Sequence, residues 1–120
     1  MPNIRFLGYV SDGERAQLMA KAQAVVIAAL EDYGLVPIEA NFSGTPAITY
    51  GAGGVLDTQV SGLTGLFFNS QTADAIREAL LKASSIEWNY AMIRHHAIDR
   101  FTEAVFFRNV SSNCASWLKP

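Results

Sequence analysis

The sequence predicts an α/β fold, a Rossmann-like parallel sheet of about four strands with flanking helices. Strand-like and helix-like segments alternate along the chain, which is typical of a parallel sheet. The run Ala24–Leu30 is uniformly apolar, as expected for a strand that is covered on both faces of such a sheet. The chain has 120 residues, of which 50% are hydrophobic, so it can form one domain with its own core.

The first half of the chain contains the first two expected strands. Ile4–Val10 reads as a short strand, and Ser11–Gly13 reads as a turn and helix cap. Glu14–Ala22 carries good helix formers, and the apolar run Ala24–Leu30 follows as the second strand. The next helix is expected from about Leu35 to Phe42.

Proline and glycine define the boundaries of that helix. Pro37 falls in the first turn, where a missing N–H costs nothing, and Gly44 followed by Pro46 ends the helix. Pro46–Tyr50 is then predicted to be the third strand. A sharp loop is expected over Gly51–Gly54.

The second half of the chain is expected to be mainly helical. Asp57–Val60 is predicted to form a short helical turn and Gly65–Phe68 the fourth strand. A strong helix begins at Thr72 or Asp74 and runs through Ala83. Its apolar stripe is expected to consist of Ile76, Leu80 and Leu81.

The last helical region is expected over Glu87–Leu118, with a break near Phe101. An apolar face runs along its later part, comprising Phe101, Val105, Phe106, Val110, Cys114 and Trp117. An exposed face of this kind favours association, so a homodimer or a larger assembly is expected.

The composition excludes several classes of function. The net charge is −2 and the basic residues are scattered, so nucleic acid is not an expected partner. The single cysteine, Cys114, cannot form an internal disulfide and fits a reducing compartment. Met1–Arg5 does not begin a signal peptide, and no apolar run has transmembrane length. A cytoplasmic location is therefore predicted.

Two carboxylates flank the start of the helix expected at Leu35. Glu31 follows the apolar strand, and Glu39 lies eight positions later, about one turn into the helix. A helix N-terminus offers unpaired N–H groups and a partial positive charge, which suit a phosphate. The two carboxylates could accept hydrogen bonds from hydroxyls on either side of a bound diphosphate. Alternatively, they are two solvated surface charges, as most acidic residues are.

The fold class favours a binding site at this position. In parallel α/β sheets the ligand lies at the carboxyl ends of the strands. Four loops are expected there: Val10–Gly13, Glu31–Gly34, Gly51–Gly54 and the residues that follow Phe68. The two acidic residues and the glycine loop should therefore converge on one edge of the sheet.

The residues in this region resemble a known family. Glu31, seven intervening residues and Glu39 match the paired-glutamate motif of retaining glycosyltransferases of the GT-B fold, family 4 (group 1). Further matching motifs occur in the order and spacing of that family: Phe6-Leu7-Gly8-Tyr9-Val10, Ser43-Gly44-Thr45-Pro46, Gly53-Gly54 and Gly62-Leu63-Thr64-Gly65-Leu66. The resemblance covers roughly residues 3 to 110.

The resemblance implies a role for each matching position in binding a nucleotide-diphosphate sugar. Glu31 would bond the hydroxyls of the donor sugar and is the implied catalytic residue, whereas Glu39 would hold the ribose hydroxyls. Gly34, Leu35 and Val36 would offer backbone N–H groups to the diphosphate. The resemblance also implies that Val10 contacts the base through its backbone. Arg15 would lie close enough to help hold the nucleotide.

The resemblance also implies which substrates and domains are involved. The donor would be a GDP- or UDP-sugar, with neither a metal nor another cofactor, and the motif residues look most like those of mannosyltransferases. The acceptor would be a glycan or a lipid, as in polysaccharide biosynthesis, so the full-length enzyme could work at the cytoplasmic face of a membrane. Residues 1–120 would form the C-terminal nucleotide-sugar-binding domain without its first strand–helix–strand unit.

The chain also departs from the family pattern. The N-terminal acceptor domain is missing, and so are the basic residues that usually contact the diphosphate. Without these charge-assisted bonds the isolated chain is expected to be inactive. The alternative function is a non-catalytic module for nucleotide-sugar binding or assembly.

Other motifs in the chain give weaker indications of function. Gly51–Gly54 begins like a dinucleotide fingerprint, but Leu56 stands where the third glycine should be. His95 and Asp99 share a helix face and could ligate a metal, although a local ion pair or plain surface is favoured. Three possible nucleophiles lack the setting for catalysis: Cys114, Ser43 and Ser61.

Overall fold

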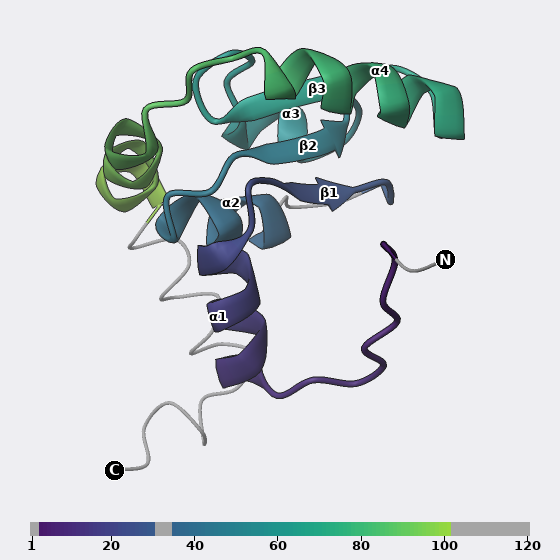
Figure 1. Ribbon diagram of the computed structural model, residues 1–120. Coiled ribbons are helices and arrows are strands. Elements are labelled where there is room, and N and C mark those ends of the chain that lie inside the picture. Colours follow the sequence, from purple (N-terminus) through teal and green to yellow (C-terminus); the bar gives the residue numbers. More distant parts are fainter. Residues whose placement is uncertain (1–2, 31–34, 102–120) are drawn as a thin grey trace, which may run out of the picture.

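The computed structural model describes residues 3–30 and 35–101, and these form the predicted α/β fold. Three parallel strands lie in the order β1-β2-β3. The strands are β1 (Val25–Ile27), β2 (Ala47–Tyr50) and β3 (Gly65–Phe68). The helices are α1 (Asp12–Lys21), α2 (Leu35–Phe42), α3 (Val55–Thr58) and α4 (Ala73–Ser84), and a further helix covers 90–101 (Figure 1).

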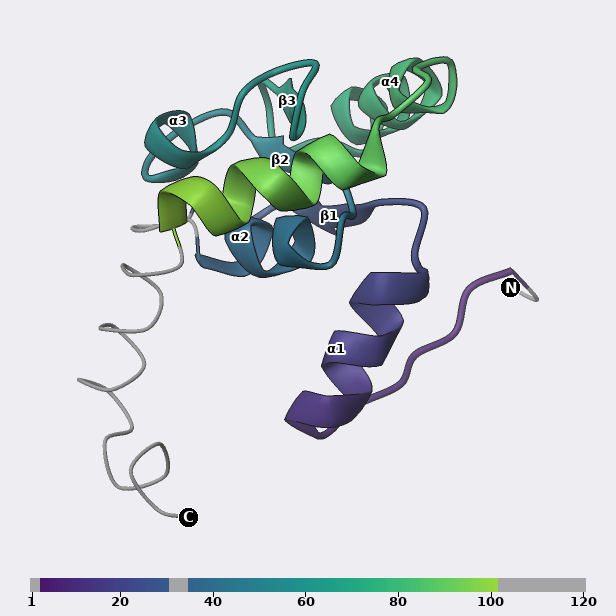
Figure 2. The ribbon, with the colours of Figure 1, turned by 90° about the vertical axis from the view of Figure 1, so that its left-hand side faces the viewer.

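Helices cover both faces of the sheet. α2 contacts β1 and β2 on one face, whereas α4 contacts β3 on the other. On the α4 face, Ile48, Leu66 and Phe68 pack with Ala79 and Ala83 in a buried cluster. Figure 2 shows the helix over 90–101 running past α2, and two of its residues, Ile93 and Ala97, are fully buried.

Gly65 sets the spacing between β2 and β3. It pairs with Ala47 in the register of β2 and β3. A Cβ atom at Gly65 would lie 1.7 Å from the carbonyl oxygen of Ala47, so no other residue fits without moving a strand. Gly44 has a φ of +80°, which ends α2 in a left-handed conformation that glycine adopts readily.

The prediction of a strand over Ile4–Val10 is wrong. This segment is not part of the sheet, and Phe6 and Tyr9 are 95% and 97% exposed. A strand needs a neighbour for its backbone hydrogen bonds, and the segment lies apart from β1 (Figures 1 and 2). The sheet therefore has three strands among the described residues rather than about four.

The expected burial of Ala24–Leu30 is also wrong. Only Val25–Ile27 forms a strand, and the side chain of Val26 is 41% exposed. β1 pairs with β2 on one side, and no described strand covers its other edge. Its apolar sequence predicted a strand covered on both faces, but a sequence run does not show which elements pack over a strand.

The helices match their predictions with small shifts. Ser11 caps α1 by accepting from the backbone N–H of Glu14, so this helix begins two residues before the expected start. In α4 the buried residues are Ala79 and Ala83, whereas Leu80 and Leu81, which we expected on the inner stripe, are exposed. The part of the last predicted helix beyond residue 101 lies outside the described residues.

Candidate functional site

The loops that follow the three strands meet at the carboxyl edge of the sheet. The side-chain amide of Gln71, in the loop after β3, donates to the backbone carbonyl of Ala28 after β1 at 2.7 Å. This bond spans the full width of the sheet, because β2 lies between the two strands. Gly53, in the loop after β2, has a φ of +75° that favours glycine. Gln71 could not be identified from the sequence, because its role depends on a contact across 43 positions.

The N-terminus of α2 lies in the chain directly after this edge. Leu35 and Val36 form the first turn, where backbone N–H groups have no acceptor within the helix. Pro37 follows and contributes no N–H. The first turn contains no acidic residue, so the positive end of the helix is not neutralised from within the helix. The predicted site residues Glu31 and Gly34 lie outside the described residues.

The structure brings two other predicted residues together. The Arg15 guanidinium on α1 forms a salt bridge with the Glu39 carboxylate on α2. Both side chains are partly exposed beside a hollow of about 250 Å³. This hollow between α1 and α2 is lined by Asp12, Arg15, Ala16, Met19, Glu39, Phe42 and Ser43. A ligand that enters it meets two carboxylates, Asp12 and Glu39, which can accept from hydroxyls, and the Arg15 guanidinium, which can donate to an anion.

Two buried polar side chains fix the position of these helices. The Thr45 hydroxyl donates to the carbonyl of Met19 at 2.6 Å, which ties the end of α1 to the turn after α2. The Asn41 amide donates to the carbonyls of Thr45 and Thr64 at 3.0 and 3.1 Å. Thr45 belongs to a motif that carried the family resemblance, and here its role is structural. Asn41 was not predicted, although a polar residue on the inner face of a helix is a recognisable signal.

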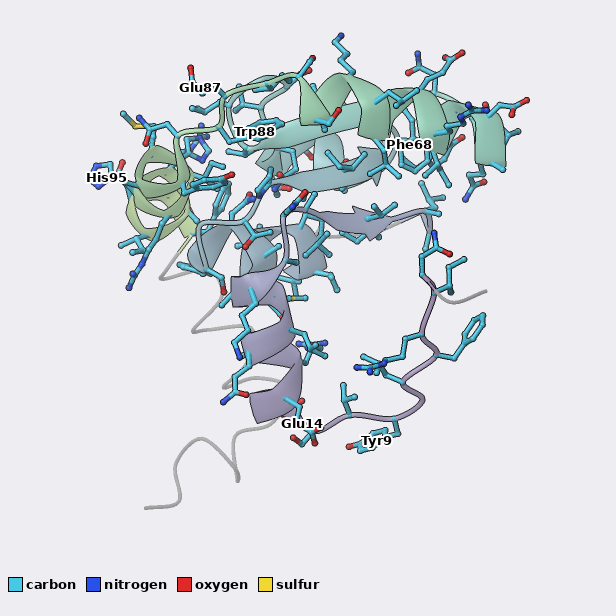
Figure 3. The ribbon with its side chains drawn as sticks, in the orientation of Figure 1. Tyr9, Glu14, Phe68, Glu87, Trp88 and His95 are labelled. Carbon is cyan, nitrogen blue, oxygen red and sulfur yellow. The ribbon has the colours of Figure 1, made fainter. Side chains whose placement is uncertain are left out.

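Val10 lies apart from this pair. It lines a separate hollow of about 270 Å³ between the N-terminal segment and α1. Figure 3 shows two of its other lining residues, Tyr9 and Glu14, at the end of α1 that is furthest from the sheet. The structure therefore places Val10 and the Arg15–Glu39 pair in different hollows.

The histidine pair has no arrangement suited to a metal. His95 points away from the sheet (Figure 3), and no group of three metal-ligating side chains occurs within 3–30 and 35–101. His96 is half-buried and packs edge-on against Phe101, with 6.0 Å between the centroids of the two rings. Burial and, to a lesser extent, the Arg100 charge lower the pKa of His96 from its ordinary value of 6.5, while Asp99 opposes the shift.

The described geometry defines a class of protein. A parallel α/β sheet with the N-terminus of a helix at its carboxyl edge, and a carboxylate one turn into that helix, belongs with the Rossmann-like domains. A sequence comparison assigns residues 1–100 to the family described as Glycosyl transferases group 1. Because this match covers most of the chain, the protein belongs to that family.

Known relatives agree with this assignment. The chain is 36% identical over 63 residues to the glycogen synthases of two strains of Mycobacterium tuberculosis. That match covers 52% of this chain and 15% of each relative. The chain thus spans about a seventh of the length of the curated relatives it matches.

A solved structure confirms the fold. The Anabaena protein HepE, crystallised in complex with UDP-glucose, matches with a TM-score of 0.65. The match has 24% sequence identity and covers 93% of this chain and 32% of HepE. Within the part of the chain that the structure describes, no helix is both long and apolar enough to cross a membrane.

Proposed function

We propose that this chain is the donor-binding part of a retaining glycosyltransferase, which transfers a sugar from a nucleotide-diphosphate sugar to a glycan or lipid acceptor. The main support for this proposal is the position of α2, in a chain that belongs to this family. The helix begins at the carboxyl edge of the sheet, and its Glu39 is joined to Arg15 beside a hollow. This arrangement offers N–H donors for a diphosphate and a carboxylate for ribose hydroxyls.

We assign the roles of the site residues from the family resemblance. The backbone N–H groups of Leu35 and Val36, together with Gly34, bind the diphosphate. Glu39 accepts from the ribose hydroxyls, and its salt bridge to Arg15 holds the carboxylate in place. Glu31 contacts the donor sugar and is the catalytic residue of this half. No protein nucleophile is required, since the chemistry depends on positioning and on stabilising charge.

The donor is a UDP- or GDP-sugar. The UDP-glucose bound to HepE favours a UDP-sugar, whereas the motif residues resemble family 4 mannosyltransferases, which favours GDP-mannose. The protein needs no other cofactor under this proposal. With a lipid acceptor, the full-length enzyme would act at the cytoplasmic face of a membrane.

The isolated chain is proposed to bind donors weakly and to turn over no substrate. It would form the C-terminal donor domain without its first strand–helix–strand unit, and the acceptor domain would close over the ligand. Without closure, hydrogen bonds to the donor compete with water. We therefore expect dissociation constants no tighter than about millimolar, equivalent to roughly −4 kcal/mol.

Saturation-transfer NMR tests the proposal on the 120-residue chain. The probes are UDP, GDP, UDP-glucose and GDP-mannose, each at millimolar concentration. We expect ligand signals for one nucleotide and its sugar conjugate, and weaker signals with Glu39→Gln. Glu87→Gln is the matched control, because this exposed carboxylate lies beyond the end of α4 (Figure 3). Equal signals from both variants, or no signal for any probe, would contradict the proposed site.

A further inference from the structure

The C-terminal end of α1 is held by a side chain from another element. The carbonyl groups in the last turn of a helix lack the N–H donors that the rest of the helix provides. One of them, the Met19 carbonyl, accepts from the buried Thr45 hydroxyl at 2.6 Å. It also accepts from the backbone N–H of Ala22, at the longer distance of 3.3 Å. The Thr45 hydroxyl is therefore the closer donor to this carbonyl and caps α1 from outside the helix.

Thr45 is itself fixed in place by α2. Its backbone N–H donates to the Ala40 carbonyl at 3.0 Å, and its carbonyl accepts from the side-chain amide of Asn41 at 3.0 Å. Only 2% of the residue is exposed. Because both of its backbone groups are bonded to α2, the Thr45 hydroxyl links the position of α1 to that of α2.

The capped carbonyl lies on the same side of α1 as the salt bridge. Arg15 precedes Met19 by four residues, so the two lie on one helix face, about 6 Å apart along the axis, and both line the hollow between α1 and α2. From its capped end, α1 extends away from the sheet (Figures 1 and 2). A partly exposed ion pair such as Arg15–Glu39 holds its own geometry only weakly. The buried bond one turn away therefore sets the distance between this guanidinium and carboxylate.

We propose that Thr45 is a positioning residue for nucleotide binding. Its hydroxyl, acting through the Met19 carbonyl, holds α1 so that Arg15 and Glu39 meet at the hollow between the two helices. The inference rests on the proposed function, in which Glu39 accepts from the ribose hydroxyls. Thr45 is not among the residues that line the hollow, so it acts on a ligand only through α1.

Replacement of Thr45 by valine removes the hydroxyl and keeps the shape of the side chain. The Met19 carbonyl then lacks its closer donor, and an unsatisfied carbonyl beside a buried methyl group is unfavourable. The carbonyl regains a partner when α1 moves away from the turn after α2 and admits water. This movement separates Arg15 from Glu39. Binding of a nucleotide and of its sugar conjugate should weaken alike, because both contain the ribose.

Titrations followed by ¹⁵N NMR test the inference on the 120-residue chain, with UDP, GDP, UDP-glucose and GDP-mannose as probes. Thr45→Val should raise the dissociation constants of the nucleotide and its conjugate by about two- to tenfold, the range that one hydrogen bond contributes. Thr45→Ser keeps the hydroxyl and should bind within about twofold of the wild type. Thr64→Val is the matched control, because it removes a buried hydroxyl that bonds to Gln59 and Val60. It should lower stability and leave the affinity unchanged.

The Nε–H signal of Arg15 gives a second readout that needs no ligand. It should move in Thr45→Val and stay near its wild-type position in Thr45→Ser and Thr64→Val. Thr45→Ala, which also lacks the hydroxyl, replaces Thr45→Val if that variant does not fold. An unmoved Arg15 signal or an unchanged affinity without the Thr45 hydroxyl would overturn the inference, and so would an equal loss of affinity in Thr64→Val. If the wild type binds no probe, the proposed function fails, and the Arg15 signal alone decides whether Thr45 positions α1.

Discussion

Replacement of Gly65 by alanine tests the close contact between β2 and β3. The new Cβ atom would lie 1.7 Å from the Ala47 carbonyl oxygen and 2.7 Å from its carbon. Side-chain atoms essentially never come closer than 3.0 Å, so β2 and β3 must move apart by more than about 1 Å. This movement disturbs the 3.0 Å hydrogen bond from the Ala47 N–H to the Thr64 carbonyl.

The expected cost follows from these two effects. Overpacking costs about 1–3 kcal/mol, and one or two weakened hydrogen bonds add about 1 kcal/mol each. The sum of roughly 2–5 kcal/mol is a large part of the total stability of a domain of this size. In urea unfolding followed by circular dichroism, the midpoint should fall by about 1–3 M.

The control is the same substitution at Gly13. This residue lies inside α1, where a Cβ atom would meet no heavy atom within 4 Å. Gly13→Ala should be neutral or stabilise by up to about 1 kcal/mol, because alanine is the better helix former. If Gly65→Ala unfolds within about 0.5 kcal/mol of the wild type, the contact between β2 and β3 has been described incorrectly.

Three further predictions concern a buried amide, a histidine and the two glutamates. Asn41→Leu removes both hydrogen bonds to backbone carbonyls, so thermal or urea unfolding should show a loss of about 2–4 kcal/mol. Because the pKa of His96 is lowered in the folded protein, the unfolded chain takes up the proton first, and the free energy of unfolding should fall as the pH drops below 6.5. Unfolding of His96→Asn should show a weaker dependence on pH in this window, and an unchanged dependence would contradict the assignment. In an enzyme that joins this chain to an acceptor domain, calorimetry should show that Glu39→Ala weakens the nucleotide and its sugar conjugate alike, whereas Glu31→Ala weakens only the conjugate, each by about 1.5–3 kcal/mol. Equal losses for nucleotide and conjugate in both variants would refute the separate roles of the two glutamates.

Local sequence signals predicted most of the fold. α2 and β3 have the expected bounds, because Pro37 and Gly44 define the helix and a turn that contains Gly62 precedes the strand. The prediction for Ile4–Val10 was wrong because strand formation depends on a neighbouring strand as well as on propensity. For the same reason the apolar residues around Val26 predicted a buried strand, whereas β1 is an edge strand in the described structure.

The candidate site was predictable only in part. Helix geometry and the spacing of acidic residues indicated Glu39 and the first turn of α2. The salt bridge to Arg15 and the hydrogen bond from Gln71 to Ala28 join residues that are 24 and 43 positions apart. A single sequence contains no local signal for such contacts, because they depend on how the strands are ordered and how the helices pack.

Above all, we propose that the carboxyl edge of this sheet binds a nucleoside diphosphate at the N-terminus of α2. Amide chemical-shift mapping by ¹⁵N NMR, with UDP and GDP titrated to about 10 mM, tests it most directly. We expect the largest shifts for the backbone amides of Leu35 and Val36, with smaller shifts around the Arg15–Glu39 pair. Shifts confined to the hollow beside Trp88, or none at either nucleotide, would contradict the claim.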